Sequence, residues 1–485
     1  WIILGHFFAV IANVGVLNPQ TLNRLLKSYL GQLIFSSRLA VDTFFFISGF
    51  LVVHNVLKKF FAESRSCWLG LYYFQRILRI LPSYAVCLVL WWKIVPLLGD
   101  GPFWYNYESF VEKCDNFWWT NMAFVNNILP WGKEESAECY YVTWYLANDM
   151  QFYFFAPILI FLYKKFSCLA FFLNVLGIAG SCCGMAYGSY HFDWSALTFD
   201  GSWSVDYSID AYTAPWFRIV PYLFGMWLAM FWNEKSNSPN PMFLTLCSRR
   251  FFMWFGMVVL LAVAFSGYFG YQRVPCNIYT NPDETDCGSG WGIWYRVTYN
   301  TLTRPFWSLG LILICSICFL NQGGLLQQIL AHRGWAPFSR LSFMAYLTHP
   351  IVLNYWVLSS KTKVFLSVQN VFVFYSGVVC GTFFVSVTLA LLVEFPIGVL
   401  AKELGKKPTE GKARPSTPES KSRSINFEPL NLSMRSSPPP RIPSTTLLLG
   451  PMKEEIDLAS PGSFESGSWS SVDSEAKGYG TYDQA

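Results

Sequence analysis

Apolar residues fill the first 400 positions of the chain in long runs, and short polar stretches separate these runs. A helix needs about 20 mostly apolar residues to cross the hydrocarbon core of a bilayer. The pattern therefore predicts about ten membrane-spanning helices, the first of which begins with the chain itself. We expect them at residues 1–17, 36–56, 80–98, 141–163, 166–188, 213–233, 251–270, 299–320, 340–358 and 366–393.

The character of the chain changes after residue 401. The stretch "KELGKKPTEGKARPSTPESKSRS" opens a C-terminal region that is rich in Ser, Pro, Lys and Glu and lacks periodic apolar positions. A segment of this composition cannot bury enough apolar surface to offset the entropy lost on ordering. The sequence therefore predicts an all-α, polytopic membrane domain over residues 1–401 and a disordered cytosolic tail over residues 402–485.

Composition supports a membrane protein and excludes other classes. The 485 residues are 53% hydrophobic and only 13% charged, whereas soluble domains carry about 25% charged residues. The net charge of +5 is small and spread along the chain, so no footprint of nucleic-acid binding is visible. The chain begins at Trp1 inside an apolar run, without the basic segment of a signal peptide, so we expect the first helix to be truncated.

The distribution of basic residues predicts the orientation of the helices. If the link after the second helix is cytosolic, alternate links contain most of the basic residues: Lys58, Lys59, Arg65, Arg76, Arg79, Lys164, Lys165, Lys235, Arg249, Arg250, Arg333 and Arg340. The opposite links include 189–212, which has four Asp and no Lys or Arg. The alternation holds at nearly every link, and "SSKTK" at 359–363 is the main exception. Both ends of the chain are then cytosolic, and the plasma membrane and the endoplasmic reticulum fit equally well.

Four of the 13 cysteines lie in two links on the side opposite to the cytosol. Cys114 and Cys139 share the loop 99–140, and Cys276 and Cys287 share the loop 271–297. Disulfides persist on this oxidising side of a membrane. We expect the bridges Cys114–Cys139 and Cys276–Cys287, with free thiols as the alternative.

Ionisable side chains inside membrane segments are costly, and by default they mark functional sites. Those in or beside the apolar runs are His6, Asp42, Arg76, Arg79, Asp149, Arg218, Arg304, His349 and Glu394. His6, in "WIILGHFFAV", is either a hydrogen-bonded core histidine or a general base, because imidazole can take and return a proton near neutral pH. Asp42 begins the second helix and either holds His6 in one tautomer or caps its own helix.

Arg76 and Arg79 lie three residues apart, so their guanidinium groups project from one face of a helix. Such a pair suits bidentate binding of phosphate and pyrophosphate groups. The alternative is a pair of arginines that snorkel to lipid headgroups, as residues at helix ends commonly do.

The remaining charges in this set have more ordinary interpretations. Asp149, Arg218, Arg304 and Glu394 are candidates for mutual ion pairs inside the bundle, and His349 precedes Pro350 near a helix break, which favours a structural role. The sequence contains no Walker A loop, G-x-S-x-G elbow, H-E-x-x-H pair or paired C-x-x-C set. Signatures of an ATP-driven pump, a serine hydrolase or a zinc site are therefore missing.

Eight segments occur in the order in which they occur in the membrane acyltransferase-3 family. They are "GHFF", "VDTFFFISGFL", "YYFQRILRILPSYA", "CDNFWWTNMAFVNN", "CYYVTWYLANDMQFYFFAPIL", "PWFRIVPYLFGMWLAM", "FSRLSFMAYLTHPIV" and a final "EFP". The chain resembles this family from residue 1 to about 397, and more narrowly its animal branch, the nose-resistant-to-fluoxetine proteins. Each motif is weak alone, and their common order makes the resemblance specific.

The resemblance implies about ten transmembrane helices around an acyl-transfer site. The histidine of the family's first helix corresponds to His6, and its R-x-x-R pair corresponds to Arg76 and Arg79, which would face acyl-CoA. We therefore predict O-acyl transfer from acyl-CoA to a lipid or small-molecule acceptor, with His6 as general base oriented by Asp42. No permanent cofactor or metal is expected. The alternative is a carrier or channel for lipids or hydrophobic small molecules; a scaffold or receptor leaves the buried charges unexplained.

Overall fold

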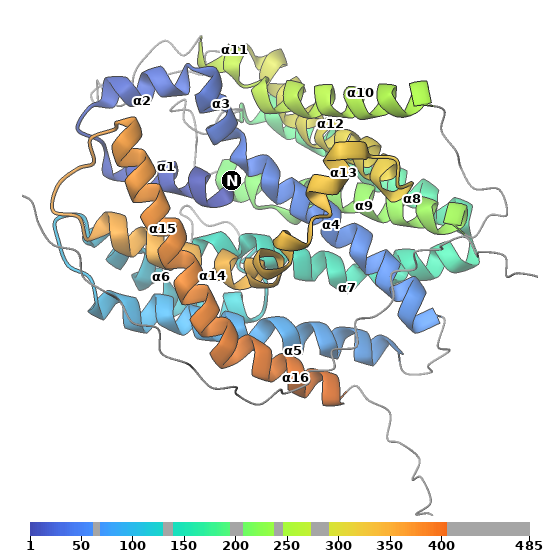
Figure 1. Ribbon diagram of the computed structural model, residues 1–485, viewed down its shortest axis with the longest axis horizontal. Coiled ribbons are helices and arrows are strands. Elements are labelled where there is room, and N and C mark those ends of the chain that lie inside the picture. The colour runs from blue at the N-terminus through green and yellow to red at the C-terminus, as the bar shows by residue number, and fades with distance from the viewer. Residues whose placement is uncertain (62–67, 130–138, 195–206, 237–245, 273–290, 405–485) are drawn as a thin grey trace, which may run out of the picture. The chain divides into compact units, whose positions relative to one another are not determined.

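The computed structural model describes residues 1–61, 68–129, 139–194, 207–236, 246–272 and 291–404 (Figure 1). Two predictions fall wholly or mostly outside these residues. The proposed bridge Cys276–Cys287 lies outside the described residues, and so does the tail from residue 405 onward. The last helix, Phe395–Leu404, extends three residues into the region that we expected to be tail.

The described residues form α-helices joined by short 3₁₀ and π-helical segments. The α-helices are α1 Ile2–Val14, α2 Pro19–Leu26, α3 Tyr29–Phe35, α4 Leu39–Asn55, α5 Trp68–Val89, α6 Tyr105–Met122, α7 Trp144–Lys165, α8 Ser167–His191, α9 Pro215–Ser236, α10 Leu246–Phe265, α11 Tyr268–Tyr271, α12 Ile293–Phe319, α13 Gly324–Leu330, α14 Ala336–Leu358, α15 Val368–Leu389 and α16 Phe395–Leu404. The shorter segments are η1 Ser36–Arg38, η2 Val56–Phe61, η3 Leu90–Ile94, η4 Val95–Leu97, η5 Tyr141–Thr143, η6 Tyr207–Tyr212, η7 Arg333–Trp335 and η8 Ala390–Glu394.

The helices bear out an all-α membrane protein. Each of the ten predicted spans overlaps a helix, and seven continuous helical stretches in the described part of the chain are long and apolar enough to cross a membrane. These seven are Tyr29–Lys58, Leu69–Leu97, Tyr141–Lys165, Ser167–His191, Cys247–Tyr271, Ile293–Phe319 and Val368–Leu400. The predicted number of ten spans is therefore slightly higher than the number of helical stretches that meet the criteria of length and hydropathy. Of the other three predicted spans, α1 has only 13 residues, and α9 and α14 are not among the seven stretches.

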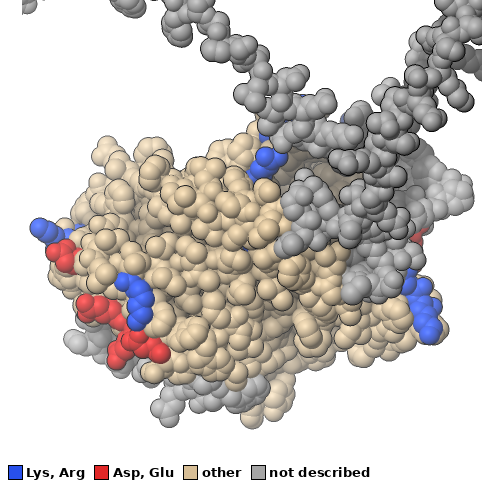
Figure 2. Space-filling view, turned by 90° about the horizontal axis from the view of Figure 1, so that it is seen from below, with Lys and Arg blue, Asp and Glu red and all other residues tan. Residues whose placement is uncertain are grey.

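Charged side chains are distributed as a membrane requires. Helices such as α5, α7 and α10 run roughly along the horizontal of Figure 1, and α4 and α15 slant across it. Figure 2 shows that the described part of the visible face has few charged side chains, and that most of these lie toward its left and right edges. A broad uncharged band between two charged edges is what a surface in contact with lipid tails needs, because a charge at the bilayer centre is costly.

Two predicted boundaries were wrong. The third span was expected over 80–98, but α5 begins at Trp68, so Arg76 and Arg79 lie inside the helix rather than on its flank. The helix can include Arg76 because a carboxylate from α7 neutralises it, as described below. The loop expected over 99–140 contains the 18-residue helix α6, whose mixed polar composition hid it among the loop residues.

The helices α4 and α9 pack closely along their length because each presents a glycine to the other. A Cβ atom at Gly49 of α4 would lie 2.2 Å from the carbonyl oxygen of Tyr222. A Cβ atom at Gly225 of α9 would lie 2.0 Å from the carbonyl oxygen of Phe46. Small residues allow the backbones of membrane helices to approach in this way.

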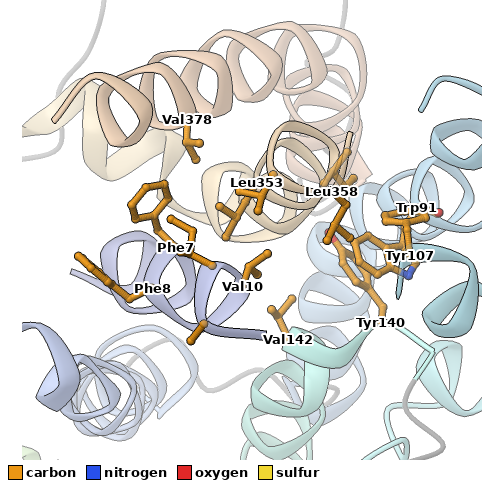
Figure 3. Packing of buried hydrophobic residues seen from close by; sticks show 14 of the residues in the cluster. Phe7, Phe8, Val10, Trp91, Tyr107, Tyr140, Val142, Leu353, Leu358 and Val378 are labelled. Carbon is orange, nitrogen blue, oxygen red and sulfur yellow. Dashed lines mark hydrogen bonds between the residues drawn. The ribbon is translucent and has the colours of Figure 1, made fainter. Parts of the chain in front are cut away.

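The first helix is anchored in the largest hydrophobic cluster of the bundle. Figure 3 shows Phe7 and Val10 of α1 turned toward Leu353 of α14, with Val378 of α15 beyond them. The same cluster extends to Trp91, whose indole N–H donates to the carbonyl oxygen of Cys139 at 3.0 Å. The backbone of α1 is thus fixed by apolar burial on the side that faces α14 and α15.

The predicted bridge Cys114–Cys139 is confirmed. It joins α6 to the segment before α7, with an S–S distance of 2.02 Å and Cα atoms 4.4 Å apart. Both cysteines are completely buried in the cluster that holds α1. The bridge therefore ties the α6 layer to the part of the core that surrounds the first helix.

Candidate functional site

The histidine of the first helix, His6, faces a second histidine from near the other end of the domain. Nδ1 of His6 lies 2.7 Å from Nε2 of His349, which belongs to α14. The two rings are parallel to within 1°, with centroids 5.0 Å apart. His6 is partly buried and His349 is completely buried. Packing of α1 against α14 therefore brings together two imidazoles that are 343 residues apart in sequence.

A cavity of about 90 Å³ adjoins His6. Its lining comes from α1, from the α3–η1–α4 segment and from η6: Ile2, Gly5, His6, Ala9, Phe35, Ser37, Arg38, Val41 and Tyr212. The ring of Tyr141 stands edge-on to His6 at 6.1 Å between centroids, and the Tyr141 hydroxyl accepts a hydrogen bond from Asn354 at 3.1 Å. The imidazole thus has a histidine partner on one side and an open space on another.

Asp42 has a different partner from the one that we predicted. Its Oδ1 accepts a hydrogen bond from Nη1 of Arg218 at 3.0 Å, and Nε of Arg304 lies 3.9 Å from the same oxygen. The hydrogen bonds of the described residues do not join Asp42 to His6, nor do they make Asp42 a helix cap. The physical reason is the close packing of α4 on α9, which buries Arg218 and leaves it in need of a carboxylate.

Arg218 is enclosed as well as paired. Its guanidinium group lies over the rings of Trp144 and Tyr212, at 4.9 and 4.2 Å from their centroids. The side chain is 1% exposed, and its partner Asp42 is 2% exposed. This cluster is separate from the histidine pair, although Arg38 and Tyr212 line the cavities beside both.

Arg76 and Arg79 line one cavity, of about 300 Å³, between α4, α5 and α7. The other lining residues are Ser48, Leu51, Val52, Asn55, Val56, Tyr72, Gln75 and Tyr153. A volume of this size lies at the lower end of the range of small-molecule pockets. The i,i+3 spacing therefore places both guanidinium groups at one hollow, as the sequence pattern indicated.

The two arginines of this cavity are not equivalent. Arg76 forms an ion pair with Asp149 of α7 and lies 4.7 Å from the ring centroid of Tyr153. The hydroxyl of Ser48 donates to the other oxygen of Asp149 at 2.5 Å. Arg79 is exposed, and within the described part of the chain its guanidinium group has no hydrogen bond or close ion pair, although its charge interacts with the carboxyl group of Glu394. Arg76 is held in place, whereas Arg79 is available to a ligand.

Tyrosines connect the histidine pair with the arginine cavity. The ring of Tyr346 lies 6.2 Å from that of His349 and 5.5 Å from that of Tyr145. Tyr145 and Asp149 are one turn apart on α7, and Asp149 contacts Arg76. The two candidate sites are thus ends of one contiguous series of contacts through the bundle.

Several partners were missed by sequence reasoning. Asp149 and Arg218 were expected to form ion pairs within the set Asp149, Arg218, Arg304 and Glu394. Instead Asp149 pairs with Arg76, which was assigned to phosphate binding, and Arg218 pairs with Asp42, which was assigned to His6 or to a helix cap. His349 was assigned a structural role, yet it contacts His6 directly. A signal was present, because His6 and His349 are the two histidines that lie well inside predicted membrane spans.

These features define a multi-pass, α-helical membrane protein whose bundle encloses a histidine pair and an arginine-lined cavity. Residues 1–391 match the family of acyltransferase domains called Acyl_transf_3. The chain therefore belongs to the acyltransferase-3 family, as the order of its motifs indicated.

The chain is also similar to two curated proteins of Caenorhabditis elegans. It is 28% identical over 381 residues to Nose resistant to fluoxetine protein 6, in an alignment that covers 74% of this chain and 44% of that protein. It is 27% identical over 220 residues to Regulator of hypoxia-inducible factor 1, covering 41% of each. The chain thus spans less than half the length of the curated relatives it matches. No solved structure matches it.

Proposed function

We propose that this protein is an integral membrane acyltransferase that moves an acyl group from acyl-CoA to a hydroxyl group of a lipid or small-molecule acceptor. The observation that carries the proposal is the imidazole of His6, which borders a cavity inside a chain of an acyltransferase family. A general base must lie within reach of the proton that it removes. The cavity is the place where an acceptor hydroxyl can approach this ring.

His6 is the general base of the proposed reaction. Its imidazole removes the proton of the acceptor hydroxyl while the hydroxyl oxygen attacks the thioester carbonyl carbon. The bond between that carbon and the sulfur of CoA then breaks, and the leaving sulfur takes the proton from His6. The products are an ester and free CoA, so the reaction needs no further reactant. Enclosure in the bundle limits competing hydrolysis by excluding water.

The arginine cavity is the proposed site for the phosphate groups of acyl-CoA. Arg79 supplies the more accessible positive charge for them, because Arg79 is exposed whereas Arg76 is already neutralised by Asp149. Arg76 then shapes the cavity wall through its contacts with Asp149 and Tyr153. The series of tyrosines from Tyr145 to His349 supports a donor whose acyl end extends inward from this cavity toward His6.

Release of free CoA tests this function. Membranes containing the protein are supplied with long- and short-chain acyl-CoAs and a lipid and metabolite extract, and thiol formation is followed for the wild type, His6→Ala and the control His54→Ala. His54 is exposed at the end of α4 and lines neither the His6 cavity nor the arginine cavity. We expect release in the wild type and the control but not in His6→Ala. Equal release by all three, or by none, contradicts the proposed function.

One observation favours a second function, a carrier or channel for lipids or hydrophobic small molecules. The cluster of Asp42, Arg218 and Arg304 is a set of buried charges that acyl transfer does not use, and such sets also line transport paths. Transport that survives His6→Ala and needs no acyl donor would favour this function. Loss of acyl-CoA binding in Arg76→Ala/Arg79→Ala favours the enzyme. For either function, we propose the plasma membrane or the endoplasmic reticulum as the location.

A further inference from the structure

A proline next to His349 determines how the histidine pair is hydrogen-bonded. In a regular helix the N–H of residue 350 would donate to the carbonyl oxygen of residue 346. Pro350 has no N–H, so the carbonyl oxygen of Tyr346 lacks that partner. Nδ1 of His349 takes its place at 2.7 Å and lies 3.2 Å from the carbonyl oxygen of Ala345.

These carbonyl groups determine which nitrogen of His349 is protonated. A carbonyl oxygen only accepts hydrogen bonds, so Nδ1 of His349 must be the donor. A second proton, on Nε2, would make a charged imidazolium at a site that is 0% exposed, and no carboxylate appears among the contacts described for this ring. Burying such a charge without a counter-charge is costly. The Nε2 atom of His349 is therefore an acceptor.

The acceptor on His349 in turn determines the tautomer of His6. Because Nε2 of His349 accepts, the hydrogen bond of 2.7 Å must be donated by Nδ1 of His6. A neutral His6 with its proton on Nδ1 has an unprotonated Nε2. We propose that His349 is a positioning residue that holds His6 in this tautomer and so makes His6 Nε2 the atom that receives the acceptor's proton.

The inference rests on the proposed acyl transfer and adds one residue to it. When His6 Nε2 receives the proton of the acceptor hydroxyl, the ring becomes an imidazolium whose Nδ1–H still donates to His349. The leaving sulfur of CoA then removes the proton from Nε2, which restores the starting tautomer. His349 exchanges no proton in this cycle. It fulfils the orienting role that the sequence had suggested for Asp42.

Substitutions of His349 separate an acceptor from a residue that only fills space. In His349→Gln the amide oxygen can accept from His6 Nδ1–H near the position of Nε2, whereas His349→Leu has a similar volume and no acceptor. General-base catalysis contributes about 10²–10⁴-fold to rates. We expect kcat for CoA release to stay within about tenfold of the wild type in His349→Gln and to fall by ~10²-fold or more in His349→Leu. KM should change little in either variant.

Two controls accompany this comparison. His54→Gln introduces the same substitution at an exposed position and should behave like the wild type. Thermal unfolding of each variant shows whether it is folded. Equal kcat values in folded His349→Gln and His349→Leu would overturn the positioning role, because packing alone does not distinguish an amide oxygen from a methyl group.

A measurement without turnover keeps the inference separate from the proposed function. The chain has only five histidines, so ring-¹⁵N-labelled histidine gives a tractable NMR spectrum of the protein in lipid, and His6→Ala identifies the signals of His6. We expect a protonated Nδ1 and an unprotonated Nε2 for His6 in the wild type and in His349→Gln. A protonated Nε2 overturns the inference even if the enzyme is active. If the wild type releases no CoA but shows the expected tautomer, the proposed function fails and the histidine geometry stands.

Discussion

Replacement of Asp42 by asparagine tests whether this carboxylate stabilises the bundle or serves His6. Asp42→Asn preserves the shape of the side chain and removes its charge. Arg218, at 3.0 Å and 1% exposed, then has no counter-charge. The guanidinium group of Arg304, at 3.9 Å from the same oxygen, loses its nearby carboxylate as well.

The expected loss of stability is large. Removing one partner of a buried ion pair costs about 3–5 kcal/mol because the other charge stays buried and uncompensated. Two arginines depend on Asp42, so we expect the upper half of that range. For a domain of this size such a loss corresponds to a fall in the unfolding temperature of about 5–6 °C.

The measurement is thermal unfolding of the purified protein in detergent, with every variant heated at the same rate because unfolding of membrane proteins is commonly irreversible. The control is Asp115→Asn, which breaks the exposed pair Lys93–Asp115, whose side chains are 55% and 60% exposed at 3.1 Å. Exposed pairs contribute at most about 1 kcal/mol. Adding Arg218→Gln to Asp42→Asn should recover part of the loss, because the unpaired charge is removed.

The opposite result would refute this reasoning. If Asp42→Asn unfolds at the same temperature as Asp115→Asn but abolishes CoA release, Asp42 acts on the reaction and not on the bundle. The ion pair with Arg218 would then be unimportant for stability, and the sequence-based hypothesis that Asp42 orients His6 would regain support.

Three further predictions concern helix packing, the disulfide and the donor cavity. Gly225→Ala should lower the free energy of unfolding by about 1–3 kcal/mol, because its Cβ atom would meet the backbone of α4; Gly180→Ala, where nothing lies within 4 Å, should not lower the unfolding temperature. Cys114→Ser should cost about 3.5 kcal/mol by opening a bridge with a sequence separation of 25, and a variant that unfolds at the wild-type temperature would contradict this. Arg79→Gln should raise KM for acyl-CoA about tenfold, because one charge-assisted contact is lost, and it should not change the unfolding temperature. Arg76→Gln should lower the unfolding temperature because Asp149 loses its partner. An unchanged KM in Arg79→Gln would exclude Arg79 from donor binding.

Patterns of neighbouring residues predicted well those features that depend on local sequence. Runs of apolar residues located the helices because crossing a bilayer imposes a length and a composition. Charge bias and cysteine position together predicted Cys114–Cys139, since both follow from the side of the membrane on which a loop lies. The spacing of Arg76 and Arg79 predicted a shared face because helix periodicity is local.

Contacts between distant helices could not be predicted in this way. Asp42 is 176 residues from Arg218, and His6 is 343 residues from His349. Local sequence patterns do not determine which helices pack against each other, so they do not predict these pairs. The start of α5 was misplaced for the same reason. From the sequence, Arg76 is expected at the polar end of a span. The structure places Arg76 inside α5, where the carboxylate of Asp149 from α7 neutralises it.

The proposed chemistry is tested most directly by acyl-CoA with separate labels in the acyl group and in CoA. The measurement follows both labels through one incubation and compares free CoA with acyl esters and free acid. We predict one ester formed for each CoA released, in an amount that falls to background in His6→Ala and is unchanged in His54→Ala. Release of CoA with free acid as the only acyl product, or ester formation that persists without His6, would contradict acyl transfer by this histidine.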